Sequence, residues 1–225
     1  LLVVVTSHDK FDGSNEKTGY WLGEVAHFQQ TVKKQGFSVD YVSPLGGSPP
    51  MDERSRDLSD SLNQAFLADP EGMARLNASF TPDQVVPAQY AAIYYAGGHG
   101  PLWDFPDNSA IQKIAMKIYS GGGVVSAVCH GPAGLLNLKT ADGSLLIRDR
   151  RVTGLDNLEE WLSGKKSLVP YRLEDELKAR GATFDAGFPF LSHVVEDGRL
   201  ITGQNPRSAV GVAEAVLRAI VASSP

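Results

Sequence analysis

Short apolar runs rich in β-branched residues alternate with amphipathic stretches along this chain, and this alternation limits its fold more than any other feature. The first half is expected to hold, in order, a strand at 1–6, a helix at 22–35, strands at 37–43 and 91–96, a helix at 111–119 and a strand at 124–128. Gly36 is well placed to end the first helix. Strands that alternate with helices predict an α/β fold in which helices cover both faces of a mostly parallel sheet.

The second half continues the pattern with shorter elements. We expect, in order, a strand at 151–154, a helix at 171–180, a strand at 182–185, a hairpin at 194–202 and a closing helix at 208–222. Asp197 and Gly198 are predicted to form the two-residue turn of the hairpin. Ser208 is expected to cap the closing helix.

Residues 48–87 interrupt this alternation of strands and helices. They are rich in Pro, Asp, Ser and Arg, with helical stretches near 58–66 and 72–76. Because no boundary separates them from the rest, we expect one domain over 1–225 with a small inserted cap region at 48–87. The insertion is expected to lie over the site or to take part in an interface.

Composition narrows the class of partner. Apolar residues make up 42% of the chain and charged residues 21%, which is typical of globular proteins. The net charge of −5 and the absence of a Lys/Arg cluster argue against nucleic acid or an anionic membrane as a partner. The opening apolar run is too short for a signal peptide or a membrane span, so we expect a cytoplasmic protein.

Cys129 is the only cysteine of the chain, and it comes directly after a predicted buried strand. His130, Gly131 and Pro132 follow it. Such a sharp strand-to-helix turn with small neighbours is typical of a nucleophile elbow, which lifts the central side chain out of the sheet. A helix that begins there is expected to lower the thiol pKa. A buried core cysteine is the ordinary alternative for a lone Cys, and the turn favours the nucleophile.

A glycine-rich loop, AGGHG at 96–100, follows the strand at 91–96. Ligands bind at the carboxyl ends of the strands in open α/β sheets, and three glycines indicate close approach of the backbone to a ligand or to Cys129. The spacing matches neither a dinucleotide fingerprint nor a P-loop, so we expect no cofactor. The histidines of the chain lack metal-ligand spacing, and we expect no metal site.

These motifs resemble the PfpI family of the class I glutamine-amidotransferase-like superfamily, whose fold is a flavodoxin-like three-layer sandwich. The resemblance is strongest to a branch of heat-shock-inducible proteins described as glutathione-independent glyoxalase III enzymes and holding chaperones. The stretches that carry it are KTGYWLGEVAHF at 17–28, residues 96–106, AVCHGPAGLL at 127–136, VTG at 152–154 and DGRLITGQNP at 197–206. They span nearly the whole chain, and the resemblance further implies a homodimer.

The resemblance implies a role for individual residues. Cys129 would be the nucleophile, His130 would transfer protons, and Glu24 would be the carboxylic acid that meets the sulfur. The backbone N–H groups of Gly98 and His130 would form the oxyanion hole. Most helical glutamates are solvated, but a carboxyl buried within the apolar stretch 20–28 would have a raised pKa.

The family's third acid, which orients the histidine, comes from the region after VTG. Glu160 falls closest to that position, while Asp156 and Glu159 are near enough to keep the assignment open.

The substrate pocket is expected to include Gly97, His99 and Trp103, although His99 could equally be a packing residue. Trp21 could also line the pocket, whereas Trp161 is expected to pack. We expect the remaining histidines, His27 and His193, to be structural or surface residues, and the charged stretches 52–60 and 174–178 to be solvated helix faces.

The resemblance points to an enzyme that converts methylglyoxal, or a related small 2-oxoaldehyde, to the 2-hydroxy acid. Methylglyoxal would give D-lactate through a hemithioacetal on Cys129, with Glu24 or His130 as the base. Such an enzyme is a cysteine-dependent lyase of the D-lactate dehydratase type. Stress chaperone activity on unfolded client proteins, or protein deglycase activity, would accompany it.

Two other interpretations remain open. One is a cysteine peptidase or amidase of the PfpI type. The other is a non-enzymatic stress chaperone or redox sensor with an exposed apolar surface or an oxidisable thiol. A glutaminase is disfavoured, because those enzymes carry a late His-x-Glu motif and His193 is followed by two valines.

Overall fold

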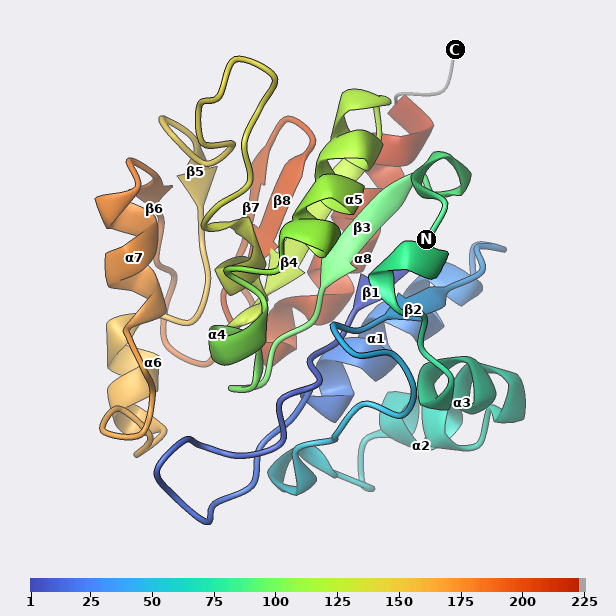
Figure 1. Ribbon diagram of the computed structural model, residues 1–225. Helices are drawn as coiled ribbons and strands as arrows, with labels where there is room; N and C mark the ends of the chain where they lie inside the picture. The colour runs from blue at the N-terminus through green and yellow to red at the C-terminus, as the bar shows by residue number, and fades with distance from the viewer. Residues whose placement is uncertain (223–225) are drawn as a thin grey trace.

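A six-stranded sheet forms the centre of the computed structural model, which describes residues 1–222 (Figure 1). In sheet order, its strands are β2 (Asp40–Val42), β1 (Leu2–Val4), β3 (Ala92–Tyr95), β4 (Val124–Val128), β8 (Leu200–Gly203) and β7 (Val194–Asp197). Neighbouring strands are parallel except for β7, which runs antiparallel to β8. The predicted, mostly parallel α/β sheet is confirmed.

Helices cover both faces of this sheet (Figure 1). The α-helices are α1 (Leu22–Lys33), α2 (Ser61–Leu67), α3 (Pro70–Asn77), α4 (Pro101–Asp104), α5 (Ser109–Ser120), α6 (Asn157–Leu162), α7 (Leu173–Ala179) and α8 (Ala209–Ala222). Short 3₁₀ helices include η1 (Glu53–Ser55), η4 (Gly131–Leu135) and η5 (Pro206–Ser208). None of the helices within residues 1–222 combines the length and apolar character needed to cross a membrane.

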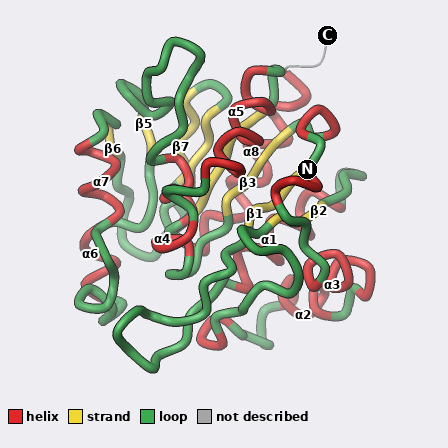
Figure 2. The backbone as a smooth tube through the Cα atoms, in the orientation of Figure 1, coloured by secondary structure: helices red, strands yellow, loops and turns green. Residues whose placement is uncertain are grey.

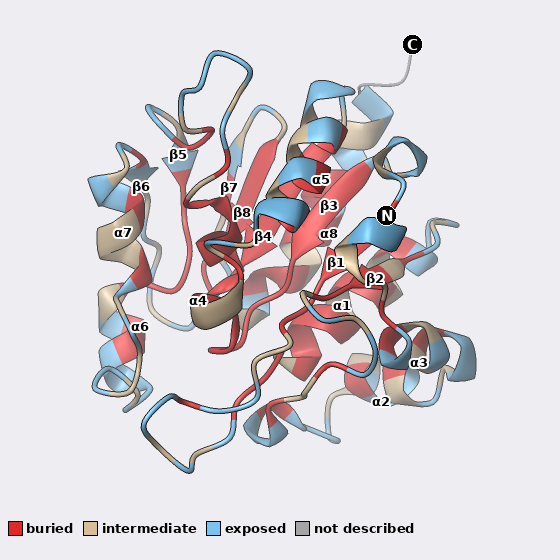
Figure 3. Ribbon diagram, viewed as in Figure 1, coloured by how far each residue is buried: buried red, intermediate tan, exposed pale blue. Residues whose placement is uncertain are grey.

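The two-residue period of the strands sorts their side chains between two cores. On β1, Val3 faces the core that contains α1 and α8, whereas Leu2 and Val4 face the core that contains α5. Figure 3 shows the central strands β1, β3, β4 and β8 buried and the outer faces of the helices exposed. This is the three-layer sandwich that the resemblance implied.

Helix α1 is fixed firmly against the sheet, which matters because it carries Glu24. Its apolar side chains are buried, and Phe28 stacks on Tyr94 of β3 with 3.9 Å between ring centroids. The hydroxyl of Tyr94 donates to the carbonyl of Glu24 at 3.1 Å. Beyond the last turn, Gly36 has a φ of 82° and its N–H donates to Lys33, so the predicted helix end is confirmed.

A turn and a helix cap near the C-terminus form at residues close to, but different from, the predicted ones. In the hairpin, Asp197 pairs with Leu200, so the two-residue turn is Gly198-Arg199 and Asp197 belongs to the strand. Gly198 has a φ of 60° and takes the first turn position, where a left-handed residue matches the twist of the strands. The capping residue before α8 is Asn205, whose side chain and that of Ser208 satisfy each other's backbone N–H groups.

Residues 48–87 lie mainly at one edge of the sheet. Helices α2 and α3 pack against α1 and β2, at the lower right of Figure 1. Only the start of the insertion, around η1, extends toward the carboxyl ends of the central strands. At the opposite edge, β5 (Arg151–Val152) and β6 (Thr183–Phe184) form a separate parallel pair beside β7.

Candidate active site

Cys129 lies at the end of β4 and has a φ of 58°, one of the few left-handed residues with a side chain. This conformation costs about 1 kcal/mol, and neighbouring segments hold it in place. Its N–H donates to the carbonyl of Gly203 at 3.0 Å, and its carbonyl accepts the N–H of Leu155 at 2.8 Å. The strand-to-helix turn is confirmed, although the helix that follows, η4, is a single short 3₁₀ segment.

Gly97 lies where three groups of the site converge. A Cβ at this position would lie 2.8 Å from Glu24 Oε2, 2.8 Å from the backbone nitrogen of His130 and 2.9 Å from the Cβ of Cys129. The N–H of Gly97 also donates to Glu24 Oε2 at 2.5 Å. Only glycine allows the loop after β3 to run between these groups, so the predicted close approach to Cys129 is confirmed.

The next residue, Gly98, has a φ of 95°, and its backbone N–H faces the sulfur of Cys129, where it acts to lower the pKa of the thiol. A Cβ there would lie 2.1 Å from the carbonyl of Gly19, which again excludes a side chain. An N–H that points at the sulfur is also suited to an oxygen that develops on the carbon bonded to that sulfur. The oxyanion role of Gly98 and His130 remains a prediction.

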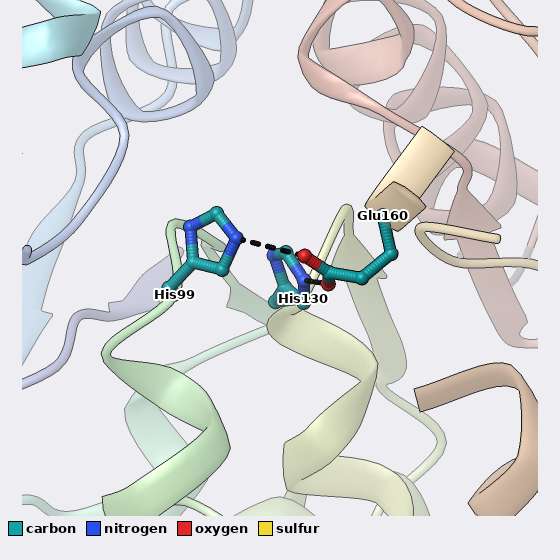
Figure 4. Close-up of side chains that lie close together, drawn as sticks. All are labelled: His99, His130 and Glu160. Atoms are coloured by element: carbon teal, nitrogen blue, oxygen red, sulfur yellow. Dashed lines mark hydrogen bonds and ion pairs between the residues drawn. The ribbon is translucent and has the colours of Figure 1, made fainter. Parts of the chain in front are cut away.

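His130 connects the thiol to a carboxylate. Its Nδ1 lies 3.6 Å from Cys129 Sγ, and its Nε2 lies 2.6 Å from Glu160 Oε2. The other oxygen of Glu160 lies 3.2 Å from His99 Nε2, so one carboxylate holds two imidazoles (Figure 4). All four residues are at most 5% exposed.

The other two acids considered for this position bond elsewhere. Asp156 is the N-cap of α6 and accepts the N–H of Glu159. The Glu159 carboxylate accepts from the backbone of Phe190 at 2.6 Å and from the side chain of Asn205 at 2.8 Å. Of the three acids, Glu160 is therefore the one that holds the ring of His130.

Burial sets the protonation of the thiol and of its neighbouring carboxyl. It raises the pKa of Glu24 to about 8, as expected for a carboxyl in that apolar stretch. Burial and the nearby Glu24 carboxyl also raise the pKa of Cys129 well above its usual value. The predicted lowering of the thiol pKa is wrong, because one turn of 3₁₀ helix contributes only about 0.3–1 kcal/mol and desolvation outweighs it.

The pKa of Glu160, the carboxylate between the two imidazoles, shifts in the opposite direction. Burial alone would raise the pKa of Glu160, but the charge of His130 and the hydrogen bonds from both imidazoles bring it below its usual range. Burial and the charge of His130 lower the pKa of His99 to about 4. At neutral pH, Glu160 is thus an anion that only accepts hydrogen bonds, and His99 is neutral.

The pocket residues contribute in different ways. Trp103 stacks on His8 with 4.8 Å between ring centroids and meets Phe11 edge to face at 5.8 Å. Phe11 was not among the predicted pocket residues. It is buried, and its ring centroid lies 5.1 Å from that of His99. Trp161 is 61% exposed, so the expectation that it packs is wrong: it lies on the outer side of the short helix whose acids face inward.

One charged residue near the site was missed. Residues 52–60 were expected to be a solvated helix face, but Asp52 is buried and holds Arg54 in a two-point ion pair. Arg54 Nη2 lies 3.4 Å from His99 Nδ1. Nothing in the local sequence indicates this contact, because the fold joins residues 45 positions apart.

A metal ion has one candidate place among the described residues. His99, His130 and Glu160 offer ligand atoms that all lie within 4.8 Å of one another. Two imidazoles and one carboxylate are ligands that suit several divalent metals. The three residues are far apart in sequence, which is why their spacing did not predict the cluster.

Comparisons with known proteins identify the family of the chain. The model of the DJ-1/PfpI family matches residues 23–219. The glutathione-independent glyoxalase HSP31 of Saccharomyces cerevisiae is 36% identical, over 93% of this chain and 92% of its own length. The crystal structure of the rapid encystment protein of Francisella tularensis superposes with a TM-score of 0.93 at 41% identity, covering 97% of both chains. Glyoxalase III from Candida albicans superposes with a TM-score of 0.86 at 31% identity, covering 97% of this chain and 95% of its own.

Proposed function

The chain belongs to the DJ-1/PfpI family, and on that premise we propose that it is a glutathione-independent glyoxalase. It would convert methylglyoxal, or a related small 2-oxoaldehyde, to the 2-hydroxy acid through a covalent adduct on Cys129. The observation that carries the proposal is the buried arrangement of the thiol between Glu24 on one side and the His130–Glu160 pair on the other. The lyase class and the dependence on cysteine are part of the proposal.

The first half of the reaction builds an enediol. His130 Nδ1 takes the thiol proton, and the thiolate adds to the aldehyde carbon. The resulting alkoxide, held by the N–H of Gly98, takes the proton of the Glu24 carboxyl. Glu24, now a carboxylate, removes the hydrogen from the former aldehyde carbon, and protonated His130 delivers its proton to the neighbouring ketone oxygen.

The second half releases the product. Glu24 returns its proton to the former ketone carbon while His130 takes the proton of the hydroxyl on the sulfur-bearing carbon, which leaves a thioester. Water activated by Glu24 then attacks the thioester, and His130 protonates the departing sulfur. The sum is one oxoaldehyde and one water giving one 2-hydroxy acid, with D-lactate expected from methylglyoxal. All three groups return to their starting protonation states.

The raised pKa of Glu24 supports this sequence, because the carboxyl starts with the proton that the alkoxide needs. The burial of Cys129, which is only 4% exposed, supports a small aldehyde over a peptide as the substrate. The test is product analysis with methylglyoxal for the wild type, Cys129→Ala and Glu24→Ala, with a peptide substrate assayed in parallel. D-lactate that depends on both side chains supports the proposal. Full turnover by Cys129→Ala would refute it.

One surface favours a second activity. The outer side of α6 and the neighbouring 188–191 loop expose large apolar side chains: Leu158, Trp161, Leu162, Phe188, Phe190 and Leu191. The backbone N–H of Phe190 donates a hydrogen bond to the carboxylate of Glu159, which holds the loop against the helix. Such a patch fits the holding of unfolded client proteins. Suppression of client aggregation should persist in Cys129→Ala and fall in Trp161→Ser, and equal suppression by both variants would contradict this role.

The homodimer and the cytoplasmic location expected from the sequence belong to the same proposal. Light scattering coupled to size exclusion would test the first, and fractionation of cells would test the second.

A further inference from the structure

Arg54 is held in a fixed orientation at the edge of the site. Its Nε lies 2.9 Å from Asp52 Oδ1 and its Nη2 lies 2.5 Å from Asp52 Oδ2, the fork geometry that guanidinium groups form with carboxylates. Asp52 is 1% exposed and also accepts from the hydroxyl of Thr18 at 3.1 Å. The guanidinium therefore cannot turn freely, and its Nη2 remains directed at His99 Nδ1, 3.4 Å away.

This contact determines where His99 carries its proton. A guanidinium has only donors, so His99 Nδ1 must offer its lone pair to Arg54. The proton of the neutral ring then resides on Nε2, which lies 3.2 Å from Glu160 Oε1 and donates to it. The hydroxyl of Ser163 lies 3.2 Å from this oxygen, but its nearer acceptor is the backbone carbonyl of Glu160, at 2.7 Å.

The same logic extends through Glu160 to the reacting sulfur. With Oε1 directed at His99 Nε2–H, the other oxygen, Oε2, accepts from His130 Nε2–H, at 2.6 Å. His130 then presents the lone pair of Nδ1 to Cys129 Sγ, 3.6 Å away. A ring with the opposite tautomer would present an N–H to the thiol and could not take its proton.

We propose that Arg54 is a positioning residue of this reaction, which acts through His99 and Glu160 to fix the tautomer of His130 that accepts the proton of Cys129. The inference rests on the proposed function, because it concerns the same thiol and the same proton. It adds a residue that takes no part in the bond-making steps of that reaction. Arg54 therefore should affect kcat and leave KM nearly unchanged.

The first experiment is kinetic, with methylglyoxal as the substrate. Arg54→Leu should lower kcat by about 10- to 50-fold, with KM within about 2-fold of the wild type. Arg54→Lys keeps the charge but loses the two-point contact with Asp52, so its kcat should lie between those of the wild type and Arg54→Leu. Arg56→Leu is the matched control, because Arg56 lies just after the same turn, is half exposed and pairs with Glu53. A kcat for Arg54→Leu within about 2-fold of the control would overturn the proposal.

The second experiment separates orientation from simple packing. In His99→Gln, the amide offers an oxygen to Arg54 and an N–H to Glu160, which reproduces the proposed tautomer. We expect His99→Gln to recover most of the kcat that His99→Leu loses, a loss of about 10-fold or more. Equal losses in the two variants, with the fold intact by circular dichroism, would count against the proposal.

The third experiment does not depend on turnover. In ¹⁵N NMR spectra of the wild type, His99 and His130 should each show a protonated Nε2 and an unprotonated Nδ1, and Arg54→Leu should show a mixture of tautomers for His99. A wild-type His99 with its proton on Nδ1 would overturn the assignment. If the wild type makes no D-lactate, the proposed function fails, while these spectra still decide whether Arg54 sets the tautomers.

Discussion

The carboxyl group of Glu24 lies against the thiol of Cys129, and the two residues are 0% and 4% exposed. Burial raises the pKa of both groups, and the Glu24 carboxyl raises the pKa of the thiol further. The pair therefore carries at most one negative charge near neutral pH. A thiolate forms there only while Glu24 keeps its proton, so the two side chains act as a unit.

The raised pKa of Glu24 predicts a pH-dependent stability. The ordinary pKa of 4.5 rises to about 8 on folding, so the folded chain binds a proton that the unfolded chain releases as pH rises. Stability associated with Glu24 is therefore complete below about pH 4.5 and is lost up to about pH 8, on the order of 4–5 kcal/mol at about 1.36 kcal/mol per pKa unit. Glu24→Gln should remove this loss, and with it the activity.

Urea unfolding at about pH 5, 7 and 9 would measure the effect. The stability of Glu24→Gln relative to the wild type should grow steadily across that series. Glu214→Gln, on the exposed side of α8, is the control and should follow the wild type at every pH. If the curves of Glu24→Gln and the wild type run parallel, the buried carboxyl does not titrate as described.

Gly97 should tolerate no side chain. In Gly97→Ala the new Cβ would push apart Glu24, His130 and Cys129, each less than 3 Å from it. We expect kcat to fall by about 100-fold and the free energy of unfolding by about 1–3 kcal/mol. Gly121→Ala is the control, since its nearest neighbour would lie at 3.3 Å, and it should leave kcat near the wild-type value. Equal kinetics of the two variants would show that the loop can move aside.

Much of the fold could be predicted because periodicity is local. The strands near 1–6, 91–96 and 124–128 differ from their neighbours in apolar pattern alone, and all three form within a residue or two of the expected bounds. The sharp turn at Cys129 could be predicted for a related reason, since it depends on adjacent residues.

The rest of the site depends on distant contacts. Glu159 and Glu160 are neighbours in sequence, and only the direction in which α6 faces the core separates their roles. The contact of Arg54 with His99 depends in the same way on where an inserted segment folds. The thiol pKa was mispredicted because the turn is local, whereas the burial that outweighs it comes from the whole core.

Access to the site should depend on the loop after β1, whose course Figure 2 shows. Glu16 of this loop forms an ion pair with Lys165, and Phe11 of the same loop packs near His99. Lys165→Met should therefore raise the rate at which iodoacetamide alkylates Cys129 by about 2- to 5-fold, because the loop opens more often. The single cysteine allows mass spectrometry to follow the reaction. Lys166→Met, at the exposed neighbouring position, should react like the wild type, and a faster reaction there as well would remove the special role of Lys165.

Two adjacent acids on α6 provide the sharpest test of how His130 is held. Glu160→Gln removes the anion that accepts from His130 Nε2, so the ring can turn its other tautomer toward the thiol, and we expect kcat to fall by about 100-fold or more. Glu159→Gln changes the neighbouring carboxylate in the same way, but an amide oxygen can still accept from Phe190 and Asn205. Its kcat should stay within about 3-fold of the wild type. Steady-state kinetics of both variants would measure the contrast, and similar losses in the two would mean that the charge of the helix as a whole, and not the contact with His130, supports the reaction.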